Sequence, residues 1–154
     1  VNFNAPGQVV IAGTASAIER AVGAAKSAGA KRALPLPVSV PSHCALMAGA
    51  AEKLAEQLAE ITINSPNIPV INNVDVAAVD SIDAIQAALA KQLHQPVRWV
   101  ETIQKMAADG VDTLIECGPG KVLVGLNKRI NKEMTGLPVF DPDSLQKALE
   151  AING

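Results

Sequence analysis

A histidine in a proline-containing turn is the residue of this chain best suited to acid–base chemistry. His43 follows Pro41-Ser42 and precedes a segment in which apolar residues recur at helical spacing as far as Ile61. Ser42 is a good N-cap candidate, because its hydroxyl can accept hydrogen bonds from first-turn amides. The pattern therefore predicts a helix whose first turn contains His43. Because the partial positive charge at a helix N-terminus disfavours imidazolium, we expect a neutral ring that can act as a general base.

A catalytic histidine also needs a group that fixes its tautomer and a nucleophile to deprotonate. The segment Gln92–Pro96 ends a predicted helix at a proline, where backbone carbonyls lack amide partners and can accept from an imidazole. No Gly-x-Ser-x-Gly elbow occurs in the sequence, so no serine nucleophile is evident. These features alone leave open that His43 only helps to cap a helix, and that His94 is a cation at a helix C-terminus.

Neither cysteine is expected to take part in chemistry. Cys44 is adjacent to His43, and neighbouring residues on a helix point in different directions, which argues against a nucleophile–base pair. Cys44 and Cys117 are far apart and outside any metal-type spacing. We expect both to be reduced, buried thiols of a cytoplasmic protein.

Two further motifs permit either a binding role or a structural one. Gly118-Pro119-Gly120-Lys121 lies at a predicted strand-to-helix turn whose amides could face a phosphate, but it lacks the Walker spacing. Its glycines could instead let the strand end pack tightly. Asn72-Asn73 could hold a ligand or bond a nearby loop through side-chain amides. Structural roles are favoured at both motifs, although the residues leave the alternatives open.

Composition restricts the class of protein. The chain has 154 residues, 49% of them hydrophobic, and a formal net charge of −2. An acidic balance argues against a nucleic-acid partner, and no apolar run is long enough to span a bilayer. We therefore expect a globular chain that binds neither nucleic acid nor membrane. Because Val1 is not an initiator Met and a strand pattern begins at once, we expect the chain to be part of a longer protein.

The predicted elements alternate between strand and helix. The predicted strands are residues 1–4, 8–12, 31–36, 70–74, 111–117 and 137–140. The predicted helices, besides the one that begins near His43, are residues 13–28, 81–93, 97–108, 121–131 and 144–152. Repeated strand–helix units imply an α/β fold with a largely parallel sheet covered by helices. A domain boundary is expected near residue 37.

Five stretches, taken in order, resemble a known family. Residues 1–13, 36–43, 69–74, 92–99 and 118–123 together resemble the bacterial malonyl-CoA:acyl carrier protein transacylases of fatty acid synthesis. The resemblance covers essentially the whole chain but only the C-terminal half of that family's sequence. The family's N-terminal half carries the nucleophilic serine, an oxyanion-hole glutamine and the arginine that clamps the malonyl carboxylate. None of these has a counterpart here.

The resemblance implies roles for three residues and a fold. His43 matches the catalytic histidine, Gln92 the position whose main-chain carbonyl orients it, and Asn2 an asparagine that lines the substrate gorge. The family fold is an α/β-hydrolase-like core with an inserted ferredoxin-like subdomain. Residues 1–37 would be the remainder of that subdomain, and residues 38–154 the C-terminal part of the core with its parallel sheet.

The resemblance also implies an activity. The family moves malonyl from coenzyme A to the phosphopantetheine thiol of acyl carrier protein through a serine ester, without a metal or redox cofactor. This chain alone would be inactive until the serine-bearing half joins it. Lys121, Lys128, Arg129 and Lys132 are expected on one helix flank, a candidate docking face for the acidic carrier protein. The alternatives are a non-catalytic binding or assembly fragment and an esterase or thioesterase of α/β-hydrolase type.

Overall fold

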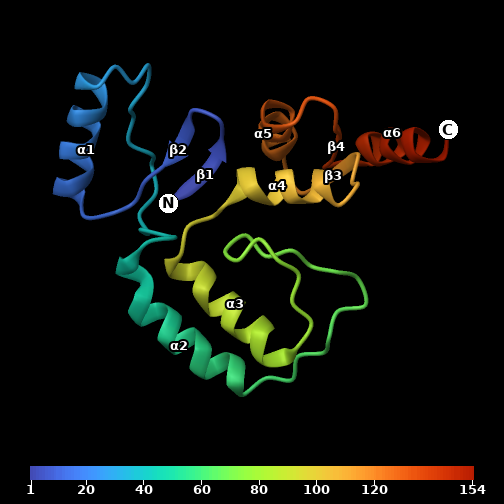
Figure 1. Ribbon diagram of the computed structural model, residues 1–154, viewed down its shortest axis with the longest axis horizontal. Helices are drawn as coiled ribbons and strands as arrows, with labels where there is room; N and C mark the ends of the chain where they lie inside the picture. The colour runs from blue at the N-terminus through green and yellow to red at the C-terminus, as the bar shows by residue number, and fades with distance from the viewer. The chain divides into compact units, whose positions relative to one another are not determined.

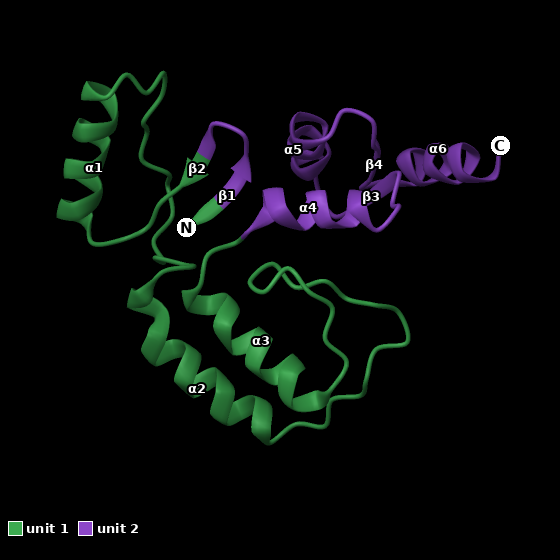
Figure 2. Cartoon of the chain, viewed as in Figure 1, with its two compact units in different colours: residues 1–2, 9–97 green, residues 3–8, 98–154 purple.

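The computed structural model describes residues 1–154, and the chain divides into two compact units (Figures 1 and 2). Unit 1 comprises residues 1–2 and 9–97, and unit 2 comprises residues 3–8 and 98–154. This division follows contacts within the chain. The domain boundary expected near residue 37 stays a prediction.

Helices dominate unit 1. They are α1 (Ala15–Ser27), the 3-10 turn η1 (Ala45–Met47), α2 (Ala48–Ala59) and α3 (Ile82–His94). The strands β1 (Asn2–Ala5) and β2 (Gln8–Val10) form a two-stranded sheet at the start of the chain. The predictions of both strands, of α1 and of α3 are confirmed to within a few residues.

The helices α2 and α3 lie side by side within unit 1 (Figure 1). Ala51 and Leu58 of α2 and Ala88 of α3 are buried, as the apolar spacing of the two helices requires. The side-chain amide of Gln86 donates to the Leu58 carbonyl at 2.7 Å and so links α3 to the last turn of α2. Ser81 caps the N-terminus of α3 by accepting from the Ala84 amide at 3.4 Å. These contacts fix where α3 begins and what it packs against.

Unit 2 contains a parallel strand pair joined through a helix. Its elements are α4 (Trp99–Ala108), β3 (Thr113–Cys117), α5 (Val122–Ile130), β4 (Thr135–Val139) and α6 (Pro142–Asn153). β3 pairs with β4 in parallel, from Thr113 opposite Thr135 to Cys117 opposite Val139. The α/β fold class with a parallel sheet is thereby confirmed.

The core of unit 2 lies beneath α4 and α5. Ile103 is 0% exposed, and the Trp99 indole nitrogen donates to the Asn127 side-chain oxygen at 2.9 Å, which links the two helices. Gly136 faces α5 so closely that a Cβ there would lie 3.1 Å from a methyl carbon of Val124. The glycine lets α5 pack closely on β4, because a side chain at this point would require the Val124 side chain to shift.

Two predicted strands are absent. Residues 31–36 form no strand, and within 70–74 only Ile71 makes an isolated bridge, to Ala78. The apolar side chains Leu34 and Leu36 are 62% and 57% exposed. A strand needs a neighbour to pair with, and these proline-flanked segments find none within this chain. None of the helices is both long and apolar enough to cross a membrane.

Candidate active site

His43 occupies a tight turn and lies outside the helix that follows it. Its φ is +59°, in the left-handed region, and helical backbone begins only at Ala45, with Cys44 as the N-cap residue. The prediction that Ser42 caps a helix with His43 in its first turn is therefore wrong. A right-handed helix cannot include a left-handed residue, so the helix starts after it. The helix-terminus argument for the charge of the ring no longer applies.

Two consecutive carbonyls at the end of α3 hold this histidine. The ring nitrogen Nδ1 lies 2.6 Å from the Gln92 carbonyl oxygen, and the backbone amide of His43 donates to the Leu93 carbonyl at 2.9 Å. Both the ring and its own peptide group are therefore fastened to the same helix turn. The segment from His43 and the end of α3, 49 residues apart in the sequence, come together in unit 1.

The sequence after α3 explains why both carbonyls are available. In a continuing helix, Gln92 would bond the amide of residue 96, but Pro96 has no N–H. Leu93 would bond Val97, whose amide instead donates to the Val1 carbonyl at 2.9 Å. The Gln92 carbonyl is left without a helical partner because proline has no N–H. The Leu93 carbonyl is left without one because the Val97 amide is used elsewhere. The open helix end expected from the sequence is thus used by His43.

The Gln92 contact determines what the ring can do. A carbonyl oxygen only accepts, so Nδ1 carries the hydrogen in this contact, and in the neutral ring Nε2 then holds the lone pair. His43 is half-buried, so the ring is partly shielded while still reachable from solvent. A hydroxyl or thiol placed at Nε2 could transfer its proton to this ring.

Asn2 follows the residue that is hydrogen-bonded to the backbone of His43. The backbone nitrogen of Val1 donates to the His43 carbonyl oxygen, and Asn2 makes a parallel bridge with Val97, just beyond α3. Asn2 is itself half-buried. The start of the chain and the end of α3 therefore border the histidine turn. The role of Asn2 as a lining residue stays a prediction.

The remaining candidate groups do not join this site. The Cys44 thiol donates to the Pro41 carbonyl at 3.1 Å and so braces the turn. Cys117 is exposed, so the prediction that it is buried is wrong; β3 has a partner strand on one side only, which leaves part of its surface uncovered. His94 ends α3, with its Nδ1 enclosed and without a hydrogen-bond partner. No group of three or more His, Cys, Asp or Glu side chains is arranged to hold a metal ion.

The helix that follows the Gly118–Lys121 turn has an acidic side chain at its N-terminus. The Glu116 carboxylate accepts from the Leu123 amide at 3.0 Å and from the Val124 amide at 2.7 Å, both at the start of α5. An acidic side chain within the chain therefore satisfies the helix N-terminus. This arrangement supports the structural interpretation of the glycines.

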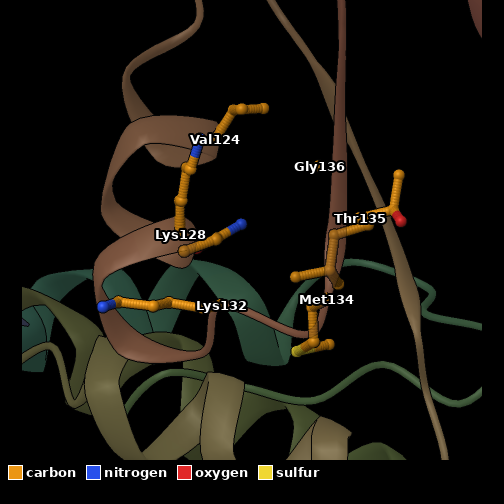
Figure 3. Close-up of a pocket in the computed structure, with 8 residues that line it drawn as sticks. Val124, Lys128, Lys132, Met134, Thr135 and Gly136 are labelled. Carbon is orange, nitrogen blue, oxygen red and sulfur yellow. The ribbon is translucent and has the colours of Figure 1, made fainter.

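The basic residues around α5 do not all point to solvent. Arg129 donates to the Gln8 side chain and to the Pro6 carbonyl, and so holds the turn between β1 and β2. Lys128 and Lys132 are exposed and line a hollow of about 320 Å³. In Figure 3 the ammonium of Lys132 extends away from β4. Two of the four predicted cations thus border one hollow in unit 2.

Comparison with known sequences gives one family and closely similar proteins. Residues 2–142 match the family described as acyl transferase domain. Over 150 residues the chain is 59% identical to the malonyl CoA-acyl carrier protein transacylase of Escherichia coli K12, which covers 97% of this chain and 48% of that protein. The protein of the same name from Bacillus subtilis 168 is 46% identical over 151 residues, 98% of this chain and 48% of that one. The chain therefore spans about half the length of the curated relatives it matches.

Solved structures give the same result. An acyl carrier protein S-malonyltransferase from Vibrio cholerae is 61% identical, with a TM-score of 0.93 over 96% of this chain and 48% of that one. A malonyl-transacylase solved in complex with a type II PKS acyl-carrier protein is 57% identical, with a TM-score of 0.96 over 98% of this chain and 49% of that one. At this level of identity over nearly the whole chain, the chain shares both the fold and the sequence family of these proteins.

Proposed function

This chain belongs to the acyl transferase domain family, and on that premise we propose that it is the histidine-bearing half of a malonyl-CoA:acyl carrier protein transacylase. The observation that carries the proposal is the 2.6 Å contact between His43 Nδ1 and the Gln92 carbonyl oxygen. Because Nδ1 carries the hydrogen in this contact, Nε2 of the neutral ring keeps the lone pair that a general base needs. The names of the similar proteins supply the substrate class, malonyl-CoA and acyl carrier protein.

In the proposed mechanism a serine hydroxyl from the other half of the protein lies at His43 Nε2. His43 takes its proton as the serine oxygen attacks the malonyl thioester, and the imidazolium returns that proton to the departing coenzyme A sulfur. The phosphopantetheine thiol of the carrier protein then gives its proton to His43 and attacks the malonyl-serine ester. The serine oxygen leaves with the proton, so the enzyme is regenerated. Gln92 supports each imidazolium through its carbonyl dipole, as the third member of a triad does.

The same proposal covers the other expected features. Asn2 would line the path of the acyl group beside the histidine turn, since its neighbour Val1 contacts His43. Residues 1–37 would complete a ferredoxin-like subdomain and residues 38–154 the core. No metal or redox cofactor enters the proposed steps. Both cysteines are free thiols, which suits a cytoplasmic enzyme.

An assay of the full-length protein that contains this chain tests the proposal. We expect malonyl to pass from malonyl-CoA to holo carrier protein, with a malonyl-enzyme ester trapped when the carrier is left out. Release of free malonate at a rate independent of the carrier protein would instead identify a thioesterase. Absence of both reactions and of the ester would identify a non-catalytic module.

The carrier-protein docking face is proposed at Lys128 and Lys132, with Lys121 at the N-terminus of α5 and Arg129 holding the turn between β1 and β2. We expect the double variant Lys128→Glu/Lys132→Glu to raise the KM for carrier protein about 5- to 10-fold at low ionic strength, because exposed charge pairs contribute modestly and are screened by salt. The effect should shrink as salt is added.

The matched control for this variant reverses two exposed lysines of unit 1, Lys26→Glu/Lys53→Glu, and makes the same change of net charge. It should leave the carrier-protein KM within about 2-fold. An equal rise in both double variants would mean that net charge, rather than a docking face at α5, sets the affinity.

A further inference from the structure

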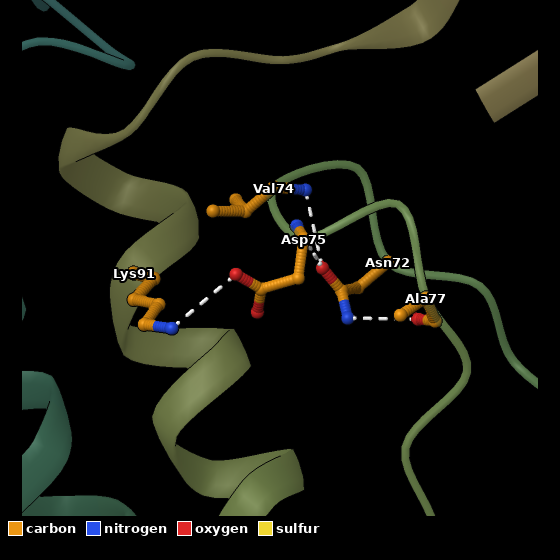
Figure 4. Close-up of polar contacts among 5 residues, drawn as sticks. All are labelled: Asn72, Val74, Asp75, Ala77 and Lys91. Carbon is orange, nitrogen blue, oxygen red and sulfur yellow. Dashed lines mark hydrogen bonds and ion pairs between the residues drawn. The ribbon is translucent and has the colours of Figure 1, made fainter. Parts of the chain in front are cut away.

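A loop in unit 1 is organised around one buried asparagine (Figure 4). Asn72 is 8% exposed, and its side-chain oxygen accepts from the backbone amides of Val74 at 3.1 Å and Asp75 at 2.8 Å. Its side-chain nitrogen donates to the Ala77 carbonyl at 3.0 Å. Every polar atom of this side chain is therefore used to shape the loop between Ile71 and Ala78.

The loop holds a residue in an unfavourable backbone conformation. Val76 has a φ of +55°, which a β-branched residue rarely adopts. The backbone amide of Val76 donates to the backbone carbonyl of Asn72, and the backbone amide of Asn72 donates to the Ala77 carbonyl, each at 3.1 Å. Strain of this kind persists only where surrounding bonds over-determine it, and it is commonest near functional sites. The hydrogen bonds within the loop therefore hold Val76 in this conformation.

The loop is attached to α3 close to the carbonyls that hold His43. Val74 is 9% exposed, and its side chain is directed toward the helix (Figure 4). The Asp75 carboxylate lies 3.3 Å from the ammonium of Lys91, the residue that directly precedes Gln92. Because both ions are partly exposed, the pair itself contributes little. The hydrogen bonds of Asn72 lie within the loop, and one of them holds the amide of Val74. The buried Val74 is therefore the part of the loop best placed to keep the last turn of α3 in position.

From this geometry we infer that Asn72 is a positioning residue for the proposed malonyl transfer. It shapes the loop 71–78, the loop fixes the last turn of α3, and that turn sets the direction of the His43 ring through Gln92. The inference rests on the proposed function, because it assigns Asn72 to the orientation of the base. Of the two roles that the sequence left open for Asn72, the hydrogen bonding of a nearby loop is the one that the structure shows.

The test uses Asn72→Ala in the full-length protein. We expect kcat for malonyl transfer to fall about 10- to 100-fold, while the KM for malonyl-CoA changes less than about 2-fold, because a small displacement of a catalytic group affects the chemical step more than binding. The ring ¹⁵N spectrum of His43 should lose its single Nδ1–H tautomer. Asn72→Asp keeps both acceptor bonds to Val74 and Asp75, so it should lose less activity.

The matched control is Asn73→Ala, the same substitution one residue further on, which should leave kcat and the His43 spectrum unchanged. If Asn72→Ala fails to fold, the folded Asn72→Asp variant must still show a lowered kcat and a mixed tautomer. A folded Asn72 variant with unchanged kcat and an unchanged His43 spectrum would overturn the inference, as would equal effects of Asn73→Ala. A wild-type protein that transfers no malonyl would contradict the proposed function instead, while the ring spectrum would still test the role of Asn72.

Discussion

Replacing His43 by glutamine in the full-length protein should lower kcat/KM for malonyl transfer about 10²- to 10⁴-fold, the usual contribution of a positioned general base. Glutamine is a neutral polar side chain of similar size that keeps an N–H donor near the Gln92 carbonyl, but it cannot accept a proton at neutral pH. The loss should therefore appear in the chemistry rather than in folding. Steady-state transfer rates together with thermal unfolding separate the two.

The other histidine of the chain provides the control. His94→Gln removes an imidazole two residues beyond Gln92, at the end of α3, whose Nδ1 makes no hydrogen bond. It should keep kcat/KM within about 3-fold, since no proton transfer is assigned to it. A His43→Gln protein with a rate close to that of the wild type would end the assignment of His43 as the base.

The chain by itself should transfer no malonyl above the uncatalysed rate. The chain carries the proposed base and its orienting carbonyl, whereas the nucleophile, the oxyanion donors and the carboxylate clamp are proposed to lie in the other half. Without a nucleophile the ping-pong route has no first step. Large apolar side chains are also uncovered, among them Val38 at 67%, Ile68 at 76% and Val122 at 72% exposure. These side chains are available to a partner surface, which the other half is proposed to supply.

Coexpression of the two halves as separate polypeptides measures this prediction. The mixture should form the malonyl-enzyme ester and pass it to the carrier protein, while each half alone should do neither. Mass spectrometry locates the ester, which should lie on the partner half. A malonyl ester on this chain, or transfer by this chain alone, would contradict the division of labour.

Most helices could be read from the sequence, because the signals that form them are local. Ser81 as an N-cap, the 3.6-residue apolar spacing and the Asp109-Gly110 stop each act within a few residues of their own helix. The apolar run of β3 was recognisable for the same reason. The sequence also showed that Pro96 must leave an acceptor open at the end of α3, since a proline nitrogen carries no hydrogen.

Only the tertiary structure decided which groups meet. The segments 31–36 and 70–74 have strand-like side chains but no strand, because pairing depends on a distant neighbour that local pattern does not contain. His43 lies outside the predicted helix. Its φ is +59°, and its backbone amide donates to the Leu93 carbonyl, a partner distant in the sequence. From the sequence alone one could predict a candidate base at His43 and an unpaired carbonyl before Pro96. Folding alone brought that carbonyl to the ring, because a contact across 49 residues has no local signature.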